Sequence, residues 1–144
     1  MRLLHAQNLT LREFLGATAP PYAILSHTWG GEEISLQQMQ AGEASQKTVA
    51  YAKLLGTCKQ ALKDGYEWVW IDTCNIDKTS SAELQEAINS MYRWYRNAAV
   101  CYVYMADVPS QRDGWEIAFT KSRWWTRGWT LRMRKLYSTS AIEH

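Results

Sequence analysis

The sequence contains few of the residues that build covalent or metal-based frameworks. Its 144 residues include only three cysteines, and these form no Cys-x-x-Cys pair: Cys58, Cys74 and Cys101. An odd number of widely spaced cysteines favours neither a disulfide framework nor a zinc site. The cysteine pattern therefore predicts a reducing, intracellular setting and no structural metal.

Long apolar runs and a strong net charge are also lacking. No run approaches the roughly 18 apolar residues of a membrane span, and the first residues have no apolar core of the length found in secretory signals. The formal net charge of +2 is too small to imply a polyanionic partner for the whole chain. We therefore expect a cytoplasmic domain that does not bind membranes.

Tryptophan and tyrosine are abundant, with eight of each in the chain. The hydrophobic fraction of 47% and the length of 144 residues suit a single domain with one core. We expect aromatic side chains to supply much of that core.

Three apolar runs end in polar residues and alternate with helical patterns. Tyr22–Ser26, Trp68–Asp72 and Val100–Met105 have the length and composition of buried strands. Helical spacing covers Thr48–Lys63 and a second segment that begins after Ser80. This alternation predicts an α/β domain with a short, mainly parallel sheet covered by helices.

Both predicted helices carry a stripe of apolar residues at helical spacing. In the first helix the stripe comprises Val49, Ala52, Leu55, Cys58, Ala61 and Leu62, and in the second Leu84, Ile88, Met91, Tyr92 and Tyr95. Ser80 and Glu83 match a capping box at the start of the second helix. Glu83 therefore has a predicted structural role.

The carboxyl ends of parallel strands meet at one edge of a sheet, where ligands usually bind. This edge should gather polar and aromatic side chains from all three strand ends: Ser26, His27, Trp29, Asp72, Asp77 and Asp107. Hydroxyl, imidazole and carboxylate groups suit a nucleotide or a sugar, and a tryptophan can stack on it. The same residue types are also common in ordinary polar loops.

Other sites are less well supported by the residues. Cys74 as a nucleophile with His27 as its base needs an acidified thiol, yet the nearby carboxylates would raise the thiol pKa. Asp72 and Asp77 could hold Mg²⁺, but no phosphate-binding glycine loop accompanies them. We expect no metal.

The C-terminal part carries a run of cations without an intervening acid: Lys121, Arg123, Arg127, Arg132, Arg134 and Lys135. Together with Trp124, Trp125 and Trp129 it could bind single-stranded nucleic acid. The alternative is that these tryptophans pack in the core and the cations are solvated, and the small net charge favours this alternative.

Four ordered segments resemble the successive blocks of the fungal heterokaryon incompatibility (HET) domain: residues 22–30, 68–78, 83–95 and 127–131. The resemblance implies a domain at 1–131, with its core blocks at 22–131 and a tail at 132–144 that looks diverged or truncated. It also implies a flavodoxin-like three-layer fold similar to Toll/interleukin-1 receptor (TIR) domains.

The family resemblance implies a role in non-self recognition and programmed cell death, through association with other HET or receptor-type domains or with further copies of itself. Some TIR domains cleave NAD with a glutamate, so NAD cleavage is an alternative, with Ser26 and Asp72 in the pocket. At the position of the family's glutamate this chain has Met133, which cannot ionise. The closing block adds Arg127 and Trp129 as ligand-binding candidates, and NAD would be a substrate rather than a cofactor.

Overall fold

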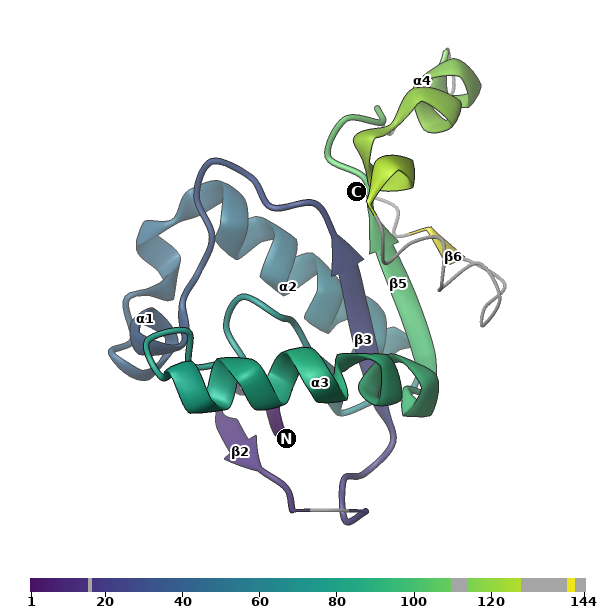
Figure 1. Ribbon diagram of the computed structural model, residues 1–144. Coiled ribbons are helices and arrows are strands. Elements are labelled where there is room, and N and C mark those ends of the chain that lie inside the picture. The colour runs from purple at the N-terminus through teal and green to yellow at the C-terminus, as the bar shows by residue number, and fades with distance from the viewer. Residues whose placement is uncertain (16, 110–113, 128–139, 142–144) are drawn as a thin grey trace.

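A computed structural model describes residues 1–15, 17–109, 114–127 and 140–141. In chain order its elements are β1 (Arg2–His5), β2 (Leu11–Glu13), β3 (Tyr22–His27), α1 (Leu36–Gln40), η1 (Ala44–Gln46), α2 (Thr48–Lys63), β4 (Trp68–Trp70), α3 (Ser81–Asn97), β5 (Val100–Tyr104), α4 (Trp115–Lys121), η2 (Arg123–Thr126) and β6 (Ser140–Ala141). Figure 1 shows α4 standing apart from the body of the domain, beyond the end of β5.

The described strands form one six-stranded sheet in the order β2-β1-β4-β3-β5-β6. Strand β3 pairs in parallel with β4 and β5, and β6 pairs in parallel with β5. Strand β1 pairs antiparallel with both β2 and β4, so the sheet is mixed. The parallel strands β4, β3 and β5 place their carboxyl ends at one edge.

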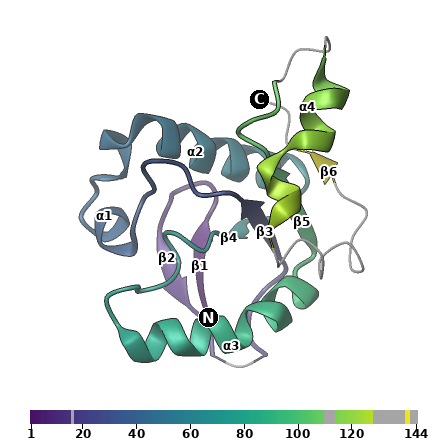
Figure 2. The same cartoon turned by 45° about the horizontal axis from the view of Figure 1, so that its top comes forward.

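Helices α2 and α3 cover opposite faces of this sheet (Figure 2). Because side chains alternate along a strand, Ala23 and Leu25 of β3 pack in the cluster under α2, whereas Tyr22 and Ile24 pack in the cluster under α3. All six residues of β3 are buried, as expected for a parallel strand with neighbours on both sides and helices on both faces.

The three strands and two helices predicted from the sequence all form. The predicted first helix has the observed bounds, Thr48–Lys63, while β4 ends at Trp70, two residues before the predicted end. The β1–β2 hairpin was not predicted. Its strands have four and three residues, which is too short for a clear alternating pattern.

The apolar stripes read from the sequence are not fully buried in either helix. In α3, Ile88 and Tyr92 are 46% and 42% exposed. The difference is larger in α2. Val49, Leu55 and Leu62 are 77%, 40% and 41% exposed. The residues that α2 buries are mostly small: Ala50, Leu54, Thr57, Cys58 and Ala61. Small side chains let the helix lie close to the sheet, so the largest apolar residues do not mark the inner face.

Only one of the two hydrogen bonds of the predicted capping box at the start of α3 forms. The Ser80 hydroxyl accepts from the Glu83 amide at 3.3 Å. The Glu83 carboxylate instead accepts from the Asp77 amide at 2.8 Å and pairs with Arg2 at 2.7 Å. Glu83 therefore has the structural role expected of it, but it joins α3 to β1 and to the loop after β4.

Asn75 links β1 to the loop that follows β4. Its side chain is buried, and its amide nitrogen donates to the Arg2 carbonyl at 3.0 Å. Its carbonyl oxygen accepts from the Ile71 amide at 3.2 Å. One side chain thus satisfies backbone groups from two segments that are far apart in sequence.

Replacing Asn75 with alanine should leave these buried backbone groups without partners. We expect Asn75→Ala to lower the free energy of unfolding by about 2 to 3 kcal/mol, measured by urea denaturation. The control is Asn89→Ala on the exposed side of α3, which should change stability by less than about 0.5 kcal/mol. Equal effects of the two substitutions would contradict this role of Asn75.

Candidate functional site

A pocket of about 280 Å³ lies at the carboxyl edge of β3 and β4, beside α3. We call it the strand-end pocket. Polar groups and aromatic rings line its rim, and apolar side chains line the rest: Ser26, His27, Trp29, Asp72, Ile76, Lys78, Leu84, Ile88, Met91, Tyr95 and Arg127. An apolar pocket with a few convergent polar groups is typical of a small-molecule site.

A larger hollow of about 780 Å³ lies elsewhere, between the segment around Pro20 and Pro21 and the outer side of α3. Its charged lining residues, Glu86 and Arg93, are both exposed. Among its described lining residues it therefore has no buried charged group that could orient a ligand.

The structure brings together five of the residues singled out from the sequence. Ser26, His27, Trp29, Asp72 and Arg127 all line the strand-end pocket. The topology places the first four there because β3 and β4 are parallel neighbours whose following loops lie side by side.

The other candidates have different positions. Asp77 accepts from the Thr79 amide at 2.9 Å and from the Gln37 side chain at 2.9 Å, so it shapes the turn before α3. Asp107 accepts from the Ser122 hydroxyl at 2.6 Å and from the Arg123 amide at 2.8 Å. Neither is among the described residues that line the pocket. Trp129 and Met133 lie outside the described residues.

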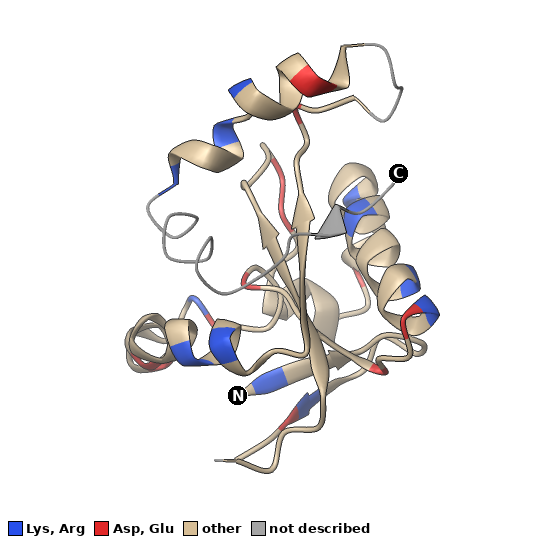
Figure 3. Cartoon of the chain, turned by 90° about the vertical axis from the view of Figure 1, so that its right-hand side faces the viewer, with Lys and Arg blue, Asp and Glu red and all other residues tan. Residues whose placement is uncertain are grey.

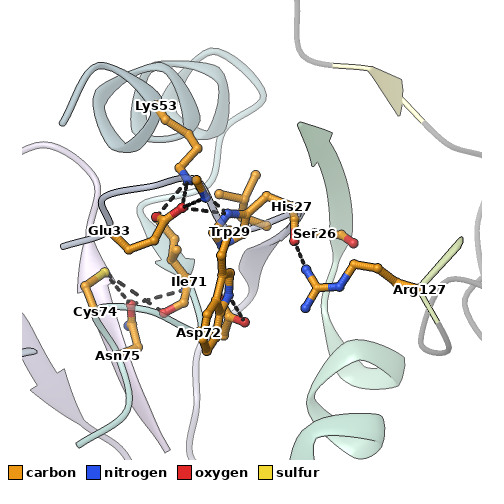
Figure 4. Close-up of polar contacts among 12 residues, drawn as sticks. Ser26, His27, Trp29, Glu33, Lys53, Ile71, Asp72, Cys74, Asn75 and Arg127 are labelled. Atoms are coloured by element: carbon orange, nitrogen blue, oxygen red, sulfur yellow. Dashed lines mark hydrogen bonds and ion pairs between the residues drawn. The ribbon is translucent and has the colours of Figure 1, made fainter. Parts of the chain in front are cut away.

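His27 is the centre of a chain of polar contacts at the pocket rim (Figure 4). Its Nε2 lies 2.9 Å from Asp72 Oδ1, and its Nδ1 lies 3.0 Å from Lys53 Nζ. Lys53 Nζ also lies 2.6 Å and 2.7 Å from the two Glu33 carboxylate oxygens. The chain runs from α2 to the pocket.

Trp29 is the last residue in this series of polar contacts and lies on the pocket side. Its indole N–H donates to Asp72 Oδ2 at 3.0 Å, and Lys78 Nζ lies 4.0 Å from the centre of its ring. The Trp29 side chain is half exposed. A ligand in the pocket would therefore meet an aromatic face, a carboxylate and a cation close together.

Burial acts to raise the pKa of Asp72, but the hydrogen bonds from His27 and Trp29 and the nearby Lys78 cation outweigh it. The pKa of Asp72 is therefore held below its usual value. The carboxyl group at the pocket rim is an anion throughout the physiological range.

Arg127 approaches the pocket from the chain beyond η2. Its guanidinium donates to the backbone carbonyl of His27 (Figure 4). Arg127 thus joins the end of β3 to the segment that carries the last of the four sequence blocks.

Glu33, Lys53 and Lys78 were missed by the sequence reasoning. Lys53 lies between Ala50 and Leu54 on the buried side of α2, and a lysine at such a position indicates a buried partner. Lys78 follows the polar strand end in sequence, but its position over Trp29 requires the three-dimensional structure.

Trp124 packs in the core. It is 2% exposed, and its indole N–H donates to Ser26 Oγ at 3.0 Å. The Trp125 indole donates to the Phe119 carbonyl. Trp124 cannot stack on a nucleic-acid base without leaving the core, and Figure 3 shows acidic residues interspersed with the basic ones on the described elements.

The described residues contain neither a cluster of metal-binding side chains nor a helix that could span a membrane. Within residues 1–15, 17–109 and 114–127, no group of three or more His, Cys, Asp or Glu side chains could hold a metal ion. Among the helices of the described chain, none is long and apolar enough to cross a membrane.

The three cysteine thiols should be unreactive in the folded protein. All three are buried, and burial raises the pKa of Cys58 and of Cys101 to about 12 and that of Cys74 further. We expect none of them to react with a thiol reagent at mildly alkaline pH and all to react in denaturant. Rapid labelling of Cys74 in the native protein would contradict this expectation and support Cys74 as a nucleophile.

The lowered pKa of Asp72 makes its contribution to stability depend on pH. The charged form stabilises the fold above the unfolded-state pKa, and this contribution is lost as pH falls through the lower folded-state value. We expect Asp72→Asn to lower the free energy of unfolding by about 1 to 2 kcal/mol at neutral pH, and the difference to shrink below about pH 4. Urea denaturation over a pH series tests this, and a difference that grows on acidification would contradict it.

Comparison with known proteins places the chain in a family. The family described as "Heterokaryon incompatibility protein (HET)" matches residues 22–115. The "Vegetative incompatibility protein HET-E-1" of Podospora anserina is 51% identical over 132 residues, covering 86% of this chain and 10% of that protein. The chain thus spans about a tenth of that relative's length.

No solved structure matches the chain significantly. The family match includes the first three of the four sequence blocks, and the fourth, at 127–131, lies beyond the matched residues. The resemblance expected from the sequence is confirmed, and it supports heterokaryon incompatibility at the family level and a fungal origin. The chain belongs to the heterokaryon incompatibility (HET) family.

Proposed function

We propose that this domain acts in fungal non-self recognition and triggers programmed cell death by associating with like domains. The observation that carries the proposal is the family match, together with the 51% identity to a protein named for vegetative incompatibility. Because the chain corresponds to a tenth of that relative, we propose that it acts as one module of a larger receptor-type protein in the cytoplasm.

A TIR-like or flavodoxin-like three-layer arrangement is part of this proposal. It is supported by the parallel pairing of β3 with β4 and β5 and by the helices on both faces of the sheet (Figure 2). The antiparallel β1–β2 hairpin extends the sheet beyond β4.

Enforced association should kill fungal cells if the domain acts in this way. We would fuse the chain to a chemically induced dimerisation module, express it in a filamentous fungus and count dead hyphal compartments with a viability dye. Death is expected only after the dimeriser is added. Survival of cells in which the dimerised domain is folded and abundant would contradict the proposal.

Binding of a nucleotide such as NAD in the strand-end pocket is a second candidate function. The observation that favours it is the grouping of Asp72, Trp29 and Lys78 in a pocket that is lined largely by apolar side chains. The carboxylate can accept from ribose hydroxyls, the indole can stack on a base or on nicotinamide, and the cation suits phosphate.

Cleavage of NAD needs a carboxylate beside the anomeric carbon, where positive charge develops. Asp72 is the one carboxylate among the described pocket-lining residues, and each of its oxygens already accepts a hydrogen bond. Position 133, where the resemblance to the family leads us to expect a glutamate, is methionine. We therefore propose binding with little or no cleavage.

Purified protein should bind NAD in calorimetry and release no nicotinamide in a chromatographic assay. Asp72→Asn should weaken binding by about tenfold, because a charge-assisted hydrogen bond is lost. Release restored by Met133→Glu would identify a lapsed enzyme. Undetectable binding by the folded wild-type protein would rule out the nucleotide candidate and leave the association proposal intact.

The same Asp72→Asn substitution separates the two candidates in cells. Death caused by association alone should persist in the dimerised Asp72→Asn domain, whereas death that depends on the pocket should be lost.

A further inference from the structure

We propose that Lys53 of α2 is a positioning residue for the strand-end pocket. By donating to Nδ1 of His27 it keeps that ring nitrogen unprotonated, and His27 in turn holds Asp72 in place through Nε2. The contribution of Lys53 to ligand binding rests on the nucleotide function proposed above, whereas its control of the tautomer does not.

The first step is the protonation of Lys53. Its side chain is 8% exposed and lies against Glu33, whose side chain is 14% exposed, with a shortest N–O distance of 2.6 Å. The bidentate contact places both carboxylate oxygens within 2.7 Å of Nζ. Lys53 is therefore an ammonium group whose charge is paired with a carboxylate.

The second step is the direction of the hydrogen bond to His27. An ammonium group carries three N–H donors and has no lone pair to accept with. At 3.0 Å from Lys53 Nζ, the Nδ1 atom of His27 must therefore be the acceptor and carry no proton. An imidazolium would point an N–H at the ammonium group at this distance, which like-charge repulsion opposes.

The third step concerns the other ring nitrogen. A neutral imidazole without a proton on Nδ1 carries it on Nε2, so Nε2–H donates to Asp72 Oδ1 at 2.9 Å. The contact between His27 and Asp72 is then a hydrogen bond from a neutral ring to a carboxylate. In the opposite tautomer an Nε2 lone pair would face the carboxylate and repel it.

The fourth step is the effect of the His27–Asp72 hydrogen bond on the pocket. His27 holds Oδ1 of Asp72, and Trp29 holds Oδ2 at 3.0 Å. Each carboxylate oxygen can accept more than one hydrogen bond, so the remaining lone pairs stay available to a ligand in a fixed orientation. Lys53 thus acts on the pocket through His27 without being among its lining residues.

A purely structural role for the Lys53–Glu33 pair is the main alternative. Glu33 also accepts from the Gly30 amide at 2.7 Å, so the pair ties α2 to the loop after β3. That role would affect stability but would not require a particular proton position on His27.

Long-range ¹H–¹⁵N NMR spectra of the imidazole rings distinguish protonated from unprotonated ring nitrogens. The His27 signals can be assigned by their absence in His27→Gln. We expect the wild-type protein to show the proton on Nε2 alone. In Lys53→Met we expect a proton to appear on Nδ1 as well, because the ammonium group that faces Nδ1 is gone and Glu33 Oε1 lies 3.9 Å from this nitrogen, while Asp72 still faces Nε2.

Two variants control for loss of charge and for disturbance of the fold. Lys59→Met makes the same change at an exposed position of α2 and should leave the His27 spectrum unchanged. Lys53→Arg keeps a cationic donor and should retain the Nε2–H form. If Lys53→Met does not fold, the wild-type and Lys53→Arg spectra still test the proposal.

Ligand binding is the second readout, with NAD as the probe in calorimetry. Lys53→Met should weaken binding by about tenfold, as expected when a partner that orients a binding group is lost, and Lys59→Met should not change it. If no variant binds NAD but the proton positions on His27 change in Lys53→Met, the nucleotide function is contradicted and the positioning role of Lys53 is supported. A wild-type ring with the proton on Nδ1, or on both nitrogens, overturns the proposal, as does an unchanged tautomer in folded Lys53→Met.

Discussion

The burial of the His27 ring is the constraint around which the candidate site is organised. His27 ends the central strand β3 and is 3% exposed, so both of its ring nitrogens need partners from within the protein. Lys53 and Asp72 provide them from two different elements. Each partner is charged and needs a partner in turn, which brings in Glu33 on one side and Trp29 on the other. Together these contacts hold the loop after β3 in place.

The strands and helices at the centre of the fold were predictable because their patterns are local. The first four residues of β3, Tyr22–Leu25, are apolar because the strand is buried on both faces. The convergence of β3 and β4 at one edge follows from their parallel pairing. The first fact can be read from the local sequence pattern, and the second follows from a general rule of α/β topology. This is why Ser26, His27 and Asp72 could be placed together before the structure was known.

The details that were missed depend on packing between segments that are distant in sequence. Lys53 is an ordinary helix residue until α2 is docked on the sheet, when its ammonium group meets His27. Asp77 and Asp107 follow strands just as Asp72 does, but their carboxylates are used by nearby turns. A carboxylate after a strand therefore identifies the correct edge of the sheet without showing which side chain faces the pocket.

The hairpin β1–β2 has a consequence for where the folding unit begins. The match to the family model starts at Tyr22, yet β1 pairs directly with β4. The Arg2 carbonyl accepts from Asn75 in the loop after β4, and the Arg2 guanidinium pairs with Glu83 in the first turn of α3. A fragment that began at Tyr22 would expose the edge of β4 and remove the backbone group that Asn75 binds. The stretch matched by the family model is thus smaller than the sheet, because strands β1 and β2 lie before it and β1 covers the edge of β4.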